Sequence, residues 1–291
     1  MGLLDGKVAI ITGAGGGLGE AYARLFAKEG AAVVVNDLGG ARDGTGGSSA
    51  AAEKVVADIV AGGGRAVANG DSVATKEGGE GILKAALDAF GQVDILVANA
   101  GILRDKTFAK MPEEDWDAVM QVHLKGTYYS VLPVWHWLRD NQRKGVIIMT
   151  SSTSGLYGNF GQSNYGAAKA GIYGFMRVLA LEGARSGIRV MALSPGAYTR
   201  MTADLPGRQD REPDPMSLPE NIAPTVLYMA SDLAEGHSGK VLLASSRGVA
   251  EIKMVQREGF RPGHPFTAED VAAHADRIFF PSDMDRVIEL P

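Results

Sequence analysis

Residues 7–19 read KVAIITGAGGGLG, a short apolar run followed directly by a cluster of glycines. The run predicts a buried strand over Lys7–Thr12, and the apolar spacing after it predicts a helix over Leu18–Glu29. A glycine loop between a strand and a helix brings backbone N–H groups to the positive end of the helix, which suits a phosphate group. A glycine cluster alone is a weak signal, but the order strand, loop, helix favours a dinucleotide site over a plain turn.

The rest of the chain alternates in the same way between β-rich runs and helical stretches. Further strands are predicted at Ala32–Asn36, Ala66–Ala68, Val93–Ala98, Val146–Thr150, Arg189–Leu193 and Val241–Ala244. Helices are predicted at Ala50–Ala61, Lys76–Phe90, Glu113–Arg139 with a bend near Pro133, Tyr165–Ser186 and Pro219–Ser231. Strands separated by helices imply βαβ crossovers, and continuous apolar runs imply a sheet covered on both faces. We therefore expect an α/β fold: one domain with a doubly wound parallel sheet of about seven strands and helices on both faces.

Composition excludes several classes of protein. The 291 residues are 45% hydrophobic and 22% charged, which is typical of a globular chain. The net charge of −5 argues against a nucleic-acid partner. There is no cysteine, which removes disulfides and thiol nucleophiles, and no His-Glu-x-x-His motif, so no metal is expected. No apolar stretch approaches the roughly 20 residues that span a bilayer, so we expect no membrane partner and a cytoplasmic location.

Asp37 is the predicted selector of the cofactor. It follows the second strand, 37 − 13 = 24 residues after Gly13. A carboxylate there can accept hydrogen bonds from the adenosine ribose and would repel a 2′-phosphate, which favours NAD over NADP. Asp71, with Ser72 beside it, follows the third strand and could face the adenine. For either aspartate alone, a simple turn or cap role is an open alternative.

Tyr165 and Lys169 are the predicted proton-transfer pair. They are four residues apart in a helical stretch, so they share one helix face. A lysine ammonium lowers the pKa of a nearby phenol, which makes tyrosine a usable general acid or base. Ser152 stands 165 − 152 = 13 residues earlier, where its hydroxyl could hold a substrate oxygen. Such a Tyr–Lys pair also recurs by chance, but the serine and the glycine loop make chance a poor explanation.

The chain resembles the short-chain dehydrogenase/reductase family. The resemblance rests on the glycine loop, the Ser152, Tyr165 and Lys169 set, and two loop motifs at residues 99–101 and 195–199. It implies a single Rossmann-type domain, hydride transfer with a nicotinamide cofactor, and a homodimer or homotetramer. It also implies that Tyr165 is the acid or base, that Lys169 binds the nicotinamide ribose, and that Ser152 positions the substrate oxygen. The predicted cofactor-binding residues are Gly13, Gly17, Leu18, Gly19, Asp37, Asp71, Ser72, Asn99, Ala100, Gly101, Tyr165, Lys169, Pro195 and Thr199.

A narrower resemblance points to the substrate. Residues 36–40, 101–105 and 157–162, and the tail at 264–267 and 269–271, are similar to the dehydrogenase unit of multifunctional enzymes of type 2. That similarity implies NAD-linked interconversion of (3R)-3-hydroxyacyl-CoA and 3-ketoacyl-CoA. The alternatives are a hydroxysteroid dehydrogenase and, from another class, a catalytically silent NAD-binding sensor or scaffold. We expect a dehydrogenase domain over residues 1–247 and a C-terminal extension over 248–291, packed on or exchanged with the same domain.

His123 is an ambiguous residue. It stands where many members of the wider family have an asparagine that helps to hold a water near the lysine. Its imidazole could carry part of a proton path, or it could be a packed helix histidine.

Overall fold

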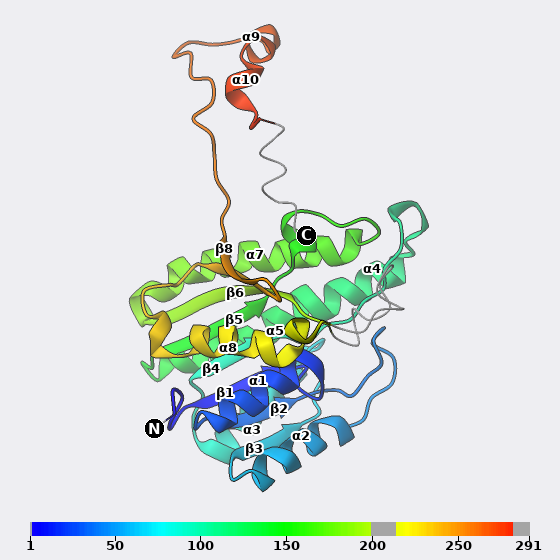
Figure 1. Cartoon of the computed structure of the whole chain (residues 1–291), viewed down its shortest axis with the longest axis vertical. Helices are drawn as coiled ribbons and strands as arrows, with labels where there is room; N and C mark the ends of the chain where they lie inside the picture. The colour runs from blue at the N-terminus through cyan, green and yellow to red at the C-terminus, as the bar shows by residue number, and fades with distance from the viewer. Residues whose placement is uncertain (1, 199–213, 282–291) are drawn as a thin grey trace. The chain divides into compact units, whose positions relative to one another are not determined.

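The computed structural model describes residues 2–198 and 214–281, which fall into two compact units that divide after Ile252. The first unit is built on one sheet of eight strands in the order β3-β2-β1-β4-β5-β6-β7-β8 (Figure 1). The strands are β1 Val8–Thr12, β2 Ala32–Asn36, β3 Arg65–Asn69, β4 Ile95–Ala98, β5 Gly145–Thr150, β6 Ile188–Gly196, β7 Val241–Ser245 and β8 Gly248–Ile252. The expected doubly wound α/β fold is confirmed.

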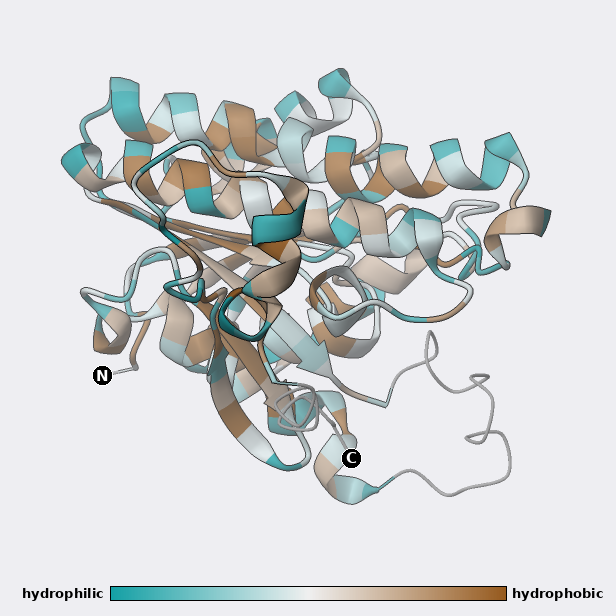
Figure 2. Ribbon diagram, turned by 90° about the horizontal axis from the view of Figure 1, so that it is seen from above, coloured by the Kyte–Doolittle hydropathy of each residue, from teal (hydrophilic) through white to brown (hydrophobic). Residues whose placement is uncertain are grey.

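Helices cover both faces of this sheet, and each face has its own hydrophobic cluster. One cluster packs under α1 (Gly17–Lys28), α2 (Ala50–Ala61) and α8 (Pro219–Ala230). The other packs under α3 (Lys76–Phe90), α5 (Gly126–Asp140) and α7 (Ser163–Gly183). Figure 2 shows the hydrophobic strands of the sheet between helices that carry both hydrophilic and hydrophobic residues.

The central strands are buried on both faces, which explains their continuous apolar runs. In β1, Ala9 and Ile11 enter the first cluster, whereas Val8 and Ile10 enter the second. All four side chains are at most 3% exposed. Burial on both faces therefore removes the polar alternation that a one-sided sheet would show.

The order of strands reverses between β1 and β4. These two strands pair in parallel, with Ala9 opposite Ile95 and Ile11 opposite Val97. The chain runs from β1 to β2 and β3 on one side and from β4 to β7 on the other. In open parallel sheets, ligands bind in the crevice beyond the carboxyl ends of the strands at such a reversal. The fold therefore places the candidate site beyond Thr12 and Ala98.

The eighth strand extends our expectation of about seven parallel strands. β8 pairs antiparallel with β7 through a tight turn, with Ser245 opposite Gly248. Val249 and its neighbours in β8 are exposed, so this edge strand lacks the apolar run that marks the buried strands. The sheet also continues five residues beyond residue 247, where we expect the dehydrogenase domain to end.

The long helix predicted over Glu113–Arg139 is in fact three segments. α4 (Glu113–Met120) leads into a π-helical turn, η2 (Gln121–Lys125), and then into α5. The irregular turn thus lies before the bend that we expect at Pro133, which is inside α5. π-helical turns inside α-helices are frequent at functional sites, and this one carries His123.

The second unit, described to residue 281, holds the short helices α9 (Ala268–Ala273) and α10 (Ala275–Ile278). Thr267 caps α9 in a capping box with Asp270. The ring of Phe260 stacks on His274 with 4.0 Å between centroids. How this extension packs or exchanges stays a prediction.

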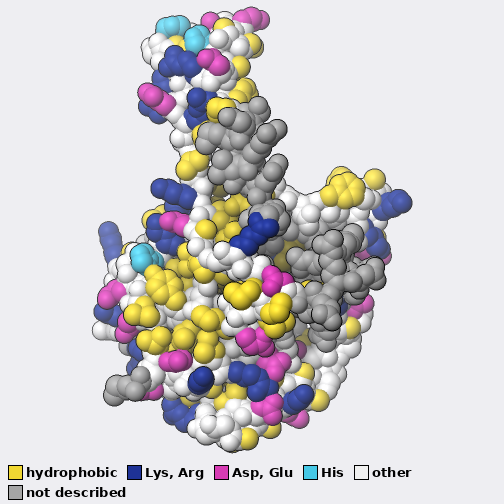
Figure 3. All heavy atoms as spheres, in the orientation of Figure 1, with side chains coloured by type: hydrophobic (Ala, Val, Ile, Leu, Met, Phe, Trp, Pro, Cys, Tyr) yellow, Lys and Arg dark blue, Asp and Glu magenta, His cyan; other side chains and the backbone are white. Residues whose placement is uncertain are grey.

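Within the described ranges, no helix is both long and apolar enough to cross a membrane. On the face drawn in Figure 3, acidic and basic side chains of the first unit are interspersed with hydrophobic ones.

Candidate active site

The turn after β4 is fastened to the end of β1. The Thr12 hydroxyl accepts hydrogen bonds from the backbone N–H groups of Asn99 (3.0 Å) and Ala100 (3.1 Å). In return, the Asn99 amide donates to the carbonyls of Thr12 (3.0 Å) and Gly13 (3.2 Å). Asn99 therefore shapes the crevice by holding its two walls together.

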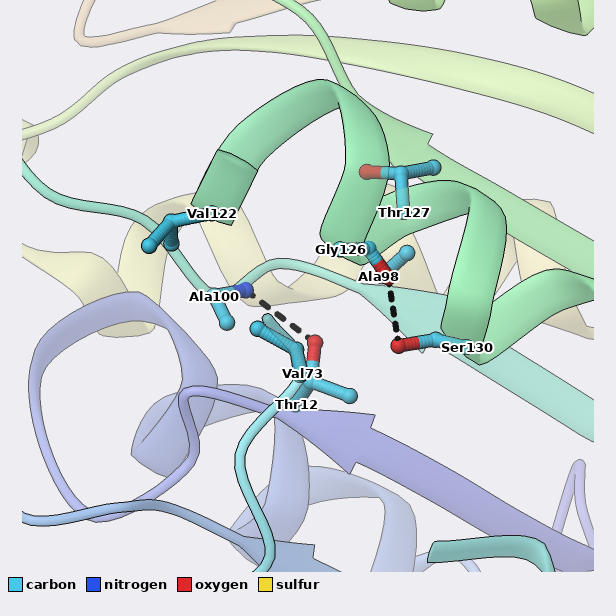
Figure 4. Close-up of a pocket in the computed structure, with 8 residues that line it drawn as sticks. All are labelled: Thr12, Val73, Ala98, Ala100, Val122, Gly126, Thr127 and Ser130. Carbon is cyan, nitrogen blue, oxygen red and sulfur yellow. Dashed lines mark hydrogen bonds between the residues drawn. The ribbon is translucent and has the colours of Figure 1, made fainter. Parts of the chain in front are cut away.

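A small gap lies beneath this turn, between the strand ends, η2 and α5 (Figure 4). It is lined by Thr12, Val73, Ala98, Ala100, Val122, Gly126, Thr127 and Ser130. The gap has no room for a water molecule, so it is part of the packing and not a ligand site.

The glycine loop has the shape that a close ligand needs. Gly13 and Gly17 adopt positive φ angles of 65° and 55°, which L side chains rarely adopt. A Cβ atom on Gly19 would stand 2.2 Å from the carbonyl oxygen of Gly13, so the helix and the loop touch there. Gly16 faces open space. Leu18 is half-buried against the hydrophobic cluster and anchors the start of α1.

Asp37 lies beside this loop, as its spacing predicts. Its Oδ2 accepts a hydrogen bond from Gly15 N (2.8 Å), and its Oδ1 accepts one from Gly39 N (2.7 Å). Asp71 is exposed at the end of β3, and its carboxylate is directed toward Gly81 of α3 while it accepts from Asn69. The Ser72 hydroxyl accepts from Ala74 N at 3.2 Å. Both residues after β3 therefore make local turn contacts.

Ser152, Tyr165 and Lys169 come together at the carboxyl ends of β5 and β6. Ser152 caps the short helix α6 (Thr153–Leu156), and its Oγ accepts from Ser154 N at 3.2 Å. Lys169 is only 2% exposed, and its Nζ donates to the carbonyl of Thr150 at 2.6 Å. The same Nζ lies 5.5 Å from the centroid of the Tyr165 ring.

Burial shifts the pKa of Tyr165 in the direction opposite to the one that we expect from the sequence. It raises the pKa of Tyr165 to about 12, while the hydrogen bond with Ser152 lowers this pKa and the charge of Asp105 raises it. Burial also lowers the pKa of Lys169 to about 7. The expected lowering by a lysine ammonium is therefore not seen, since a dry site disfavours the charged forms of both residues.

His123 belongs to this site by geometry. It is 2% exposed, and its ring meets that of Tyr165 edge-on with 5.1 Å between centroids. Its Nε2 lies 3.1 Å from Ile102 N and 2.8 Å from Ile102 O, so either tautomer can bond there. A Cβ atom on Gly101 would stand 2.3 Å from His123 Cε1, which explains the glycine. The packed-histidine alternative therefore has direct support.

One predicted cofactor residue lies near the end of β6. Pro195 is half-buried in β6, opposite Ala244 of β7. Thr199 lies outside the described residues.

No group of three or more His, Asp or Glu within residues 2–198 and 214–281 could hold a metal ion.

Sequence reasoning missed Asp105, in the loop after β4, whose charge acts on Tyr165, and Gln162, in the turn before α7. The Gln162 amide donates to the Asp105 carboxylate at 2.8 Å. Both residues stand inside the motifs at 101–105 and 157–162, but only the fold reveals that these motifs touch.

The comparisons with known proteins agree with this architecture. The short chain dehydrogenase family matches residues 7–210, so the chain belongs to the short-chain dehydrogenases and is an oxidoreductase. A relative in Mycobacterium tuberculosis, named as a short-chain type dehydrogenase/reductase, is 49% identical over 92% of each chain. Peroxisomal multifunctional enzyme type 2 of Mus musculus is 48% identical over 81% of this chain but only 31% of that enzyme. The structure of carveol dehydrogenase from Mycobacterium avium in complex with NAD matches 84% of this chain and 98% of that one, with a TM-score of 0.77 and 26% identity.

Replacing Gly19 with alanine should weaken NAD binding without unfolding the protein. The added Cβ must displace the Gly13 carbonyl, which moves the loop that would hold the phosphates. We expect the affinity measured by titration calorimetry to fall about tenfold or more, the loss of at least one charge-assisted hydrogen bond. Gly174→Ala is the matched control, since it sits in open space on α7 and should leave NAD binding unchanged. Equal affinities in the two variants would refute this role of Gly19.

His123 should make the protein less stable in acid. Burial, then the charge of Lys169, lowers its folded pKa from 6.5 to about 3. As the pH falls below 6.5, the unfolded chain binds the proton first, so the free energy of unfolding drops by up to about 1.4 kcal/mol per pH unit. The drop ends near pH 3, where the folded protein also binds the proton.

Urea unfolding of the native protein and of His123→Asn, measured between the two pKa values, tests this assignment. The difference between their free energies of unfolding should change with pH by up to about 1.4 kcal/mol per pH unit, because asparagine does not titrate. Parallel pH dependences would show that His123 is not buried in its neutral form.

Proposed function

We propose that this oxidoreductase uses NAD(H) to interconvert a secondary alcohol and a ketone, and that its substrate pair is (3R)-3-hydroxyacyl-CoA and 3-ketoacyl-CoA. The observation that carries the reaction type is the meeting of Ser152, Tyr165 and buried Lys169 beyond the end of β5. The silent sensor or scaffold is disfavoured because this set is intact, and turnover decides between the two.

NAD fits the crevice, as the family and the NAD complex of a structural neighbour support. When bound, NAD accepts or returns a hydride. We propose that residues 13–19 hold its phosphates at the start of α1 and that Asp37 holds the adenosine ribose. Two backbone N–H groups already point at the Asp37 carboxylate, so this side chain is pre-positioned at the edge of the loop. The turn at 99–101 and Pro195 complete the proposed cofactor contacts.

Ser152 and Tyr165 are proposed to handle the substrate oxygen. Ser152 Oγ accepts from the Ser154 N–H, and its own hydrogen, which is shared with Tyr165 in the free protein, can be donated to that oxygen. Tyr165, whose pKa lies near 12 in the free protein, starts as a proton donor and suits ketone reduction. Alcohol oxidation needs the phenolate, which a positive charge on Lys169 and on the oxidised nicotinamide would favour.

The acyl-CoA assignment rests on the narrower similarity. The match to the mouse multifunctional enzyme extends over 235 residues. The motifs at 101–105 and 157–162 that carry the resemblance meet beside Tyr165, where they can shape the substrate site. The hydroxysteroid alternative is retained, since the composition of residues 198–218 does not distinguish an acyl chain from a steroid.

We also propose a homodimer or homotetramer and a cytoplasmic location. Two apolar side chains of α7 face solvent, Val178 at 52% and Leu181 at 79% exposure. Such exposed residues on one helix support an interface with another copy of the chain.

Tyr165→Phe should abolish most turnover but spare cofactor binding. The substitution keeps the ring and deletes the proton donor, and a general acid or base typically contributes about 10²–10⁴-fold. We expect kcat to fall by at least about a hundredfold, with little change in the Kd for NAD. Tyr173→Phe, two turns further along α7, is the matched control and should keep normal turnover. Near-normal kcat in Tyr165→Phe would disprove the assigned role.

The substrate is tested by NADH formation with purified (3R)- and (3S)-3-hydroxyacyl-CoA and with hydroxysteroids. Fixed positions for the substrate oxygen and for the nicotinamide allow only one enantiomer to reach a reactive geometry. We expect strong preference for the (3R) thioester. If both enantiomers react equally, or only steroids react, the acyl-CoA proposal fails while the family assignment stands.

A further inference from the structure

A chain of hydrogen bonds connects Asp105, in the loop after β4, with the Ser152 turn. The Gln162 amide donates from Nε2 to Asp105 Oδ2 (2.8 Å), and its Oε1 accepts from the Ser154 hydroxyl (2.7 Å). The Ser154 N–H then donates to Ser152 Oγ (3.2 Å). Gln162 is 7% exposed, so these bonds are largely shielded from water.

Asp105 decides which way the Gln162 amide points. An ionised carboxylate can only accept hydrogen bonds, so the NH₂ end of the amide must face it. The oxygen end is then turned toward Ser154, and it also accepts from Asn159 Nδ2 at 2.9 Å. The Ser154 hydroxyl and the Asn159 NH₂ group can both donate to this oxygen, so the orientation imposed by the carboxylate satisfies every bond of the amide.

The orientation has a consequence for Ser152. Ser154 is held through its hydroxyl by Gln162, and its backbone N–H is thereby kept against Ser152 Oγ. That N–H occupies one acceptor position of Ser152, so the Ser152 proton, which is shared with Tyr165 in the free protein, can be donated to a ligand. A loosened Ser154 would let Ser152 rotate into other arrangements.

We infer that Asp105 and Gln162 are positioning residues, which fix the Ser152 hydroxyl as a donor through the Ser154 turn. This inference rests on the proposed function, because it takes Ser152 and Tyr165 to be the groups that handle the substrate oxygen.

The fold does not need the Gln162 side chain to keep these segments together. A backbone bridge joins Lys106 to Gln162, and the Asn164 amide donates to the carbonyl of Arg104 at 3.0 Å. Asn164 is fully buried. The side-chain bonds of Gln162 therefore act on the Ser152 turn more than on the stability of the fold.

Asp105 also acts on Tyr165 by its charge, because a nearby negative charge disfavours the phenolate. Among the described residues, the other groups that face Tyr165 are Lys169 on its own helix, His123 from η2 and the Ser152 hydroxyl. Burial keeps His123 neutral at ordinary pH, since it lowers the pKa of that imidazole to about 3.

The cations next to Asp105 in the chain are already engaged with Asp115. Arg104 lies 3.3 Å and Lys106 lies 3.0 Å from that carboxylate. Asp105 Oδ1 is enclosed and has no hydrogen-bond partner among the described residues. The charge of Asp105 is thus only partly balanced where it faces Tyr165.

Kinetics over a range of pH with (3R)-3-hydroxydecanoyl-CoA and NAD test the inference. Gln162→Met keeps the length of the side chain and removes its hydrogen bonds, so kcat should fall about three- to tenfold, as for one neutral hydrogen bond. Its KM for NAD and the position of the pH profile should not change.

Asp105→Asn should shift the ascending limb of the kcat profile to lower pH, because the charge near Tyr165 is gone. Asp88→Asn, at the far end of α3, is the charge control and should match the native protein in every measurement.

Hydrogen–deuterium exchange of residues 153–157 gives a readout without turnover. Exchange there should be faster in Gln162→Met and in Ser154→Ala, which cuts the same chain of bonds if the first variant does not fold. If the native protein does not oxidise the thioester, the proposed function fails, and the exchange data still decide the positioning role. Native exchange and native kcat in both variants would overturn that role, and an unmoved pH limb in Asp105→Asn would overturn the electrostatic one.

Discussion

The hydrogen bonds between Thr12 and the Asn99–Ala100 turn are the constraint on which the site depends. They fasten β1 to β4 where the strand order reverses, so the crevice has a closed base. The same approach brings Ala100 so close that a Cβ on Gly13 would stand 2.8 Å from its Cα. The glycine loop is therefore set by two contacts, with the turn after β4 and with its own helix at Gly19.

Burial beyond this base sets the electrostatics of the site. Lys169 and His123 are each 2% exposed, and water can stabilise the charged form of neither. The pKa values of both residues are lowered and that of Tyr165 is raised, so near pH 7 His123 and Tyr165 of the free protein are neutral and Lys169 is close to its titration midpoint. A bound charge, or a charge that develops during the reaction, would then interact strongly with these groups, because little water competes for them. Burying polar groups in this way destabilises the fold. The two hydrophobic clusters of the sheet offset that loss of stability.

The sequence predicts an element of the fold wherever a local pattern is enough to define that element. Apolar runs predict the buried strands, and the spacing of Tyr165 and Lys169 places both on α7. Local sequence patterns do not predict a structure that depends on packing between distant segments or on the edge of the sheet. β8 is exposed at the sheet edge, and its sequence GVAEI lacks the continuous apolar run of the buried strands. The π-helical turn at Gln121–Lys125 has no glycine or proline to mark it, and Pro133 is instead accommodated in α5.

The pairing of Asp105 with Gln162 shows what a sequence alone withholds. The residues are 57 positions apart, and an aspartate after a strand or a glutamine before a helix is ordinary at either place. Their significance comes from the orientation that one imposes on the other, because a carboxylate fixes which end of an amide faces the Ser152 turn. Donor and acceptor directions of this kind do not follow from residue spacing, since they require both partners and their common neighbour to be located. Spacing can therefore identify the groups that meet a substrate, whereas the groups that aim them become visible only in the folded chain.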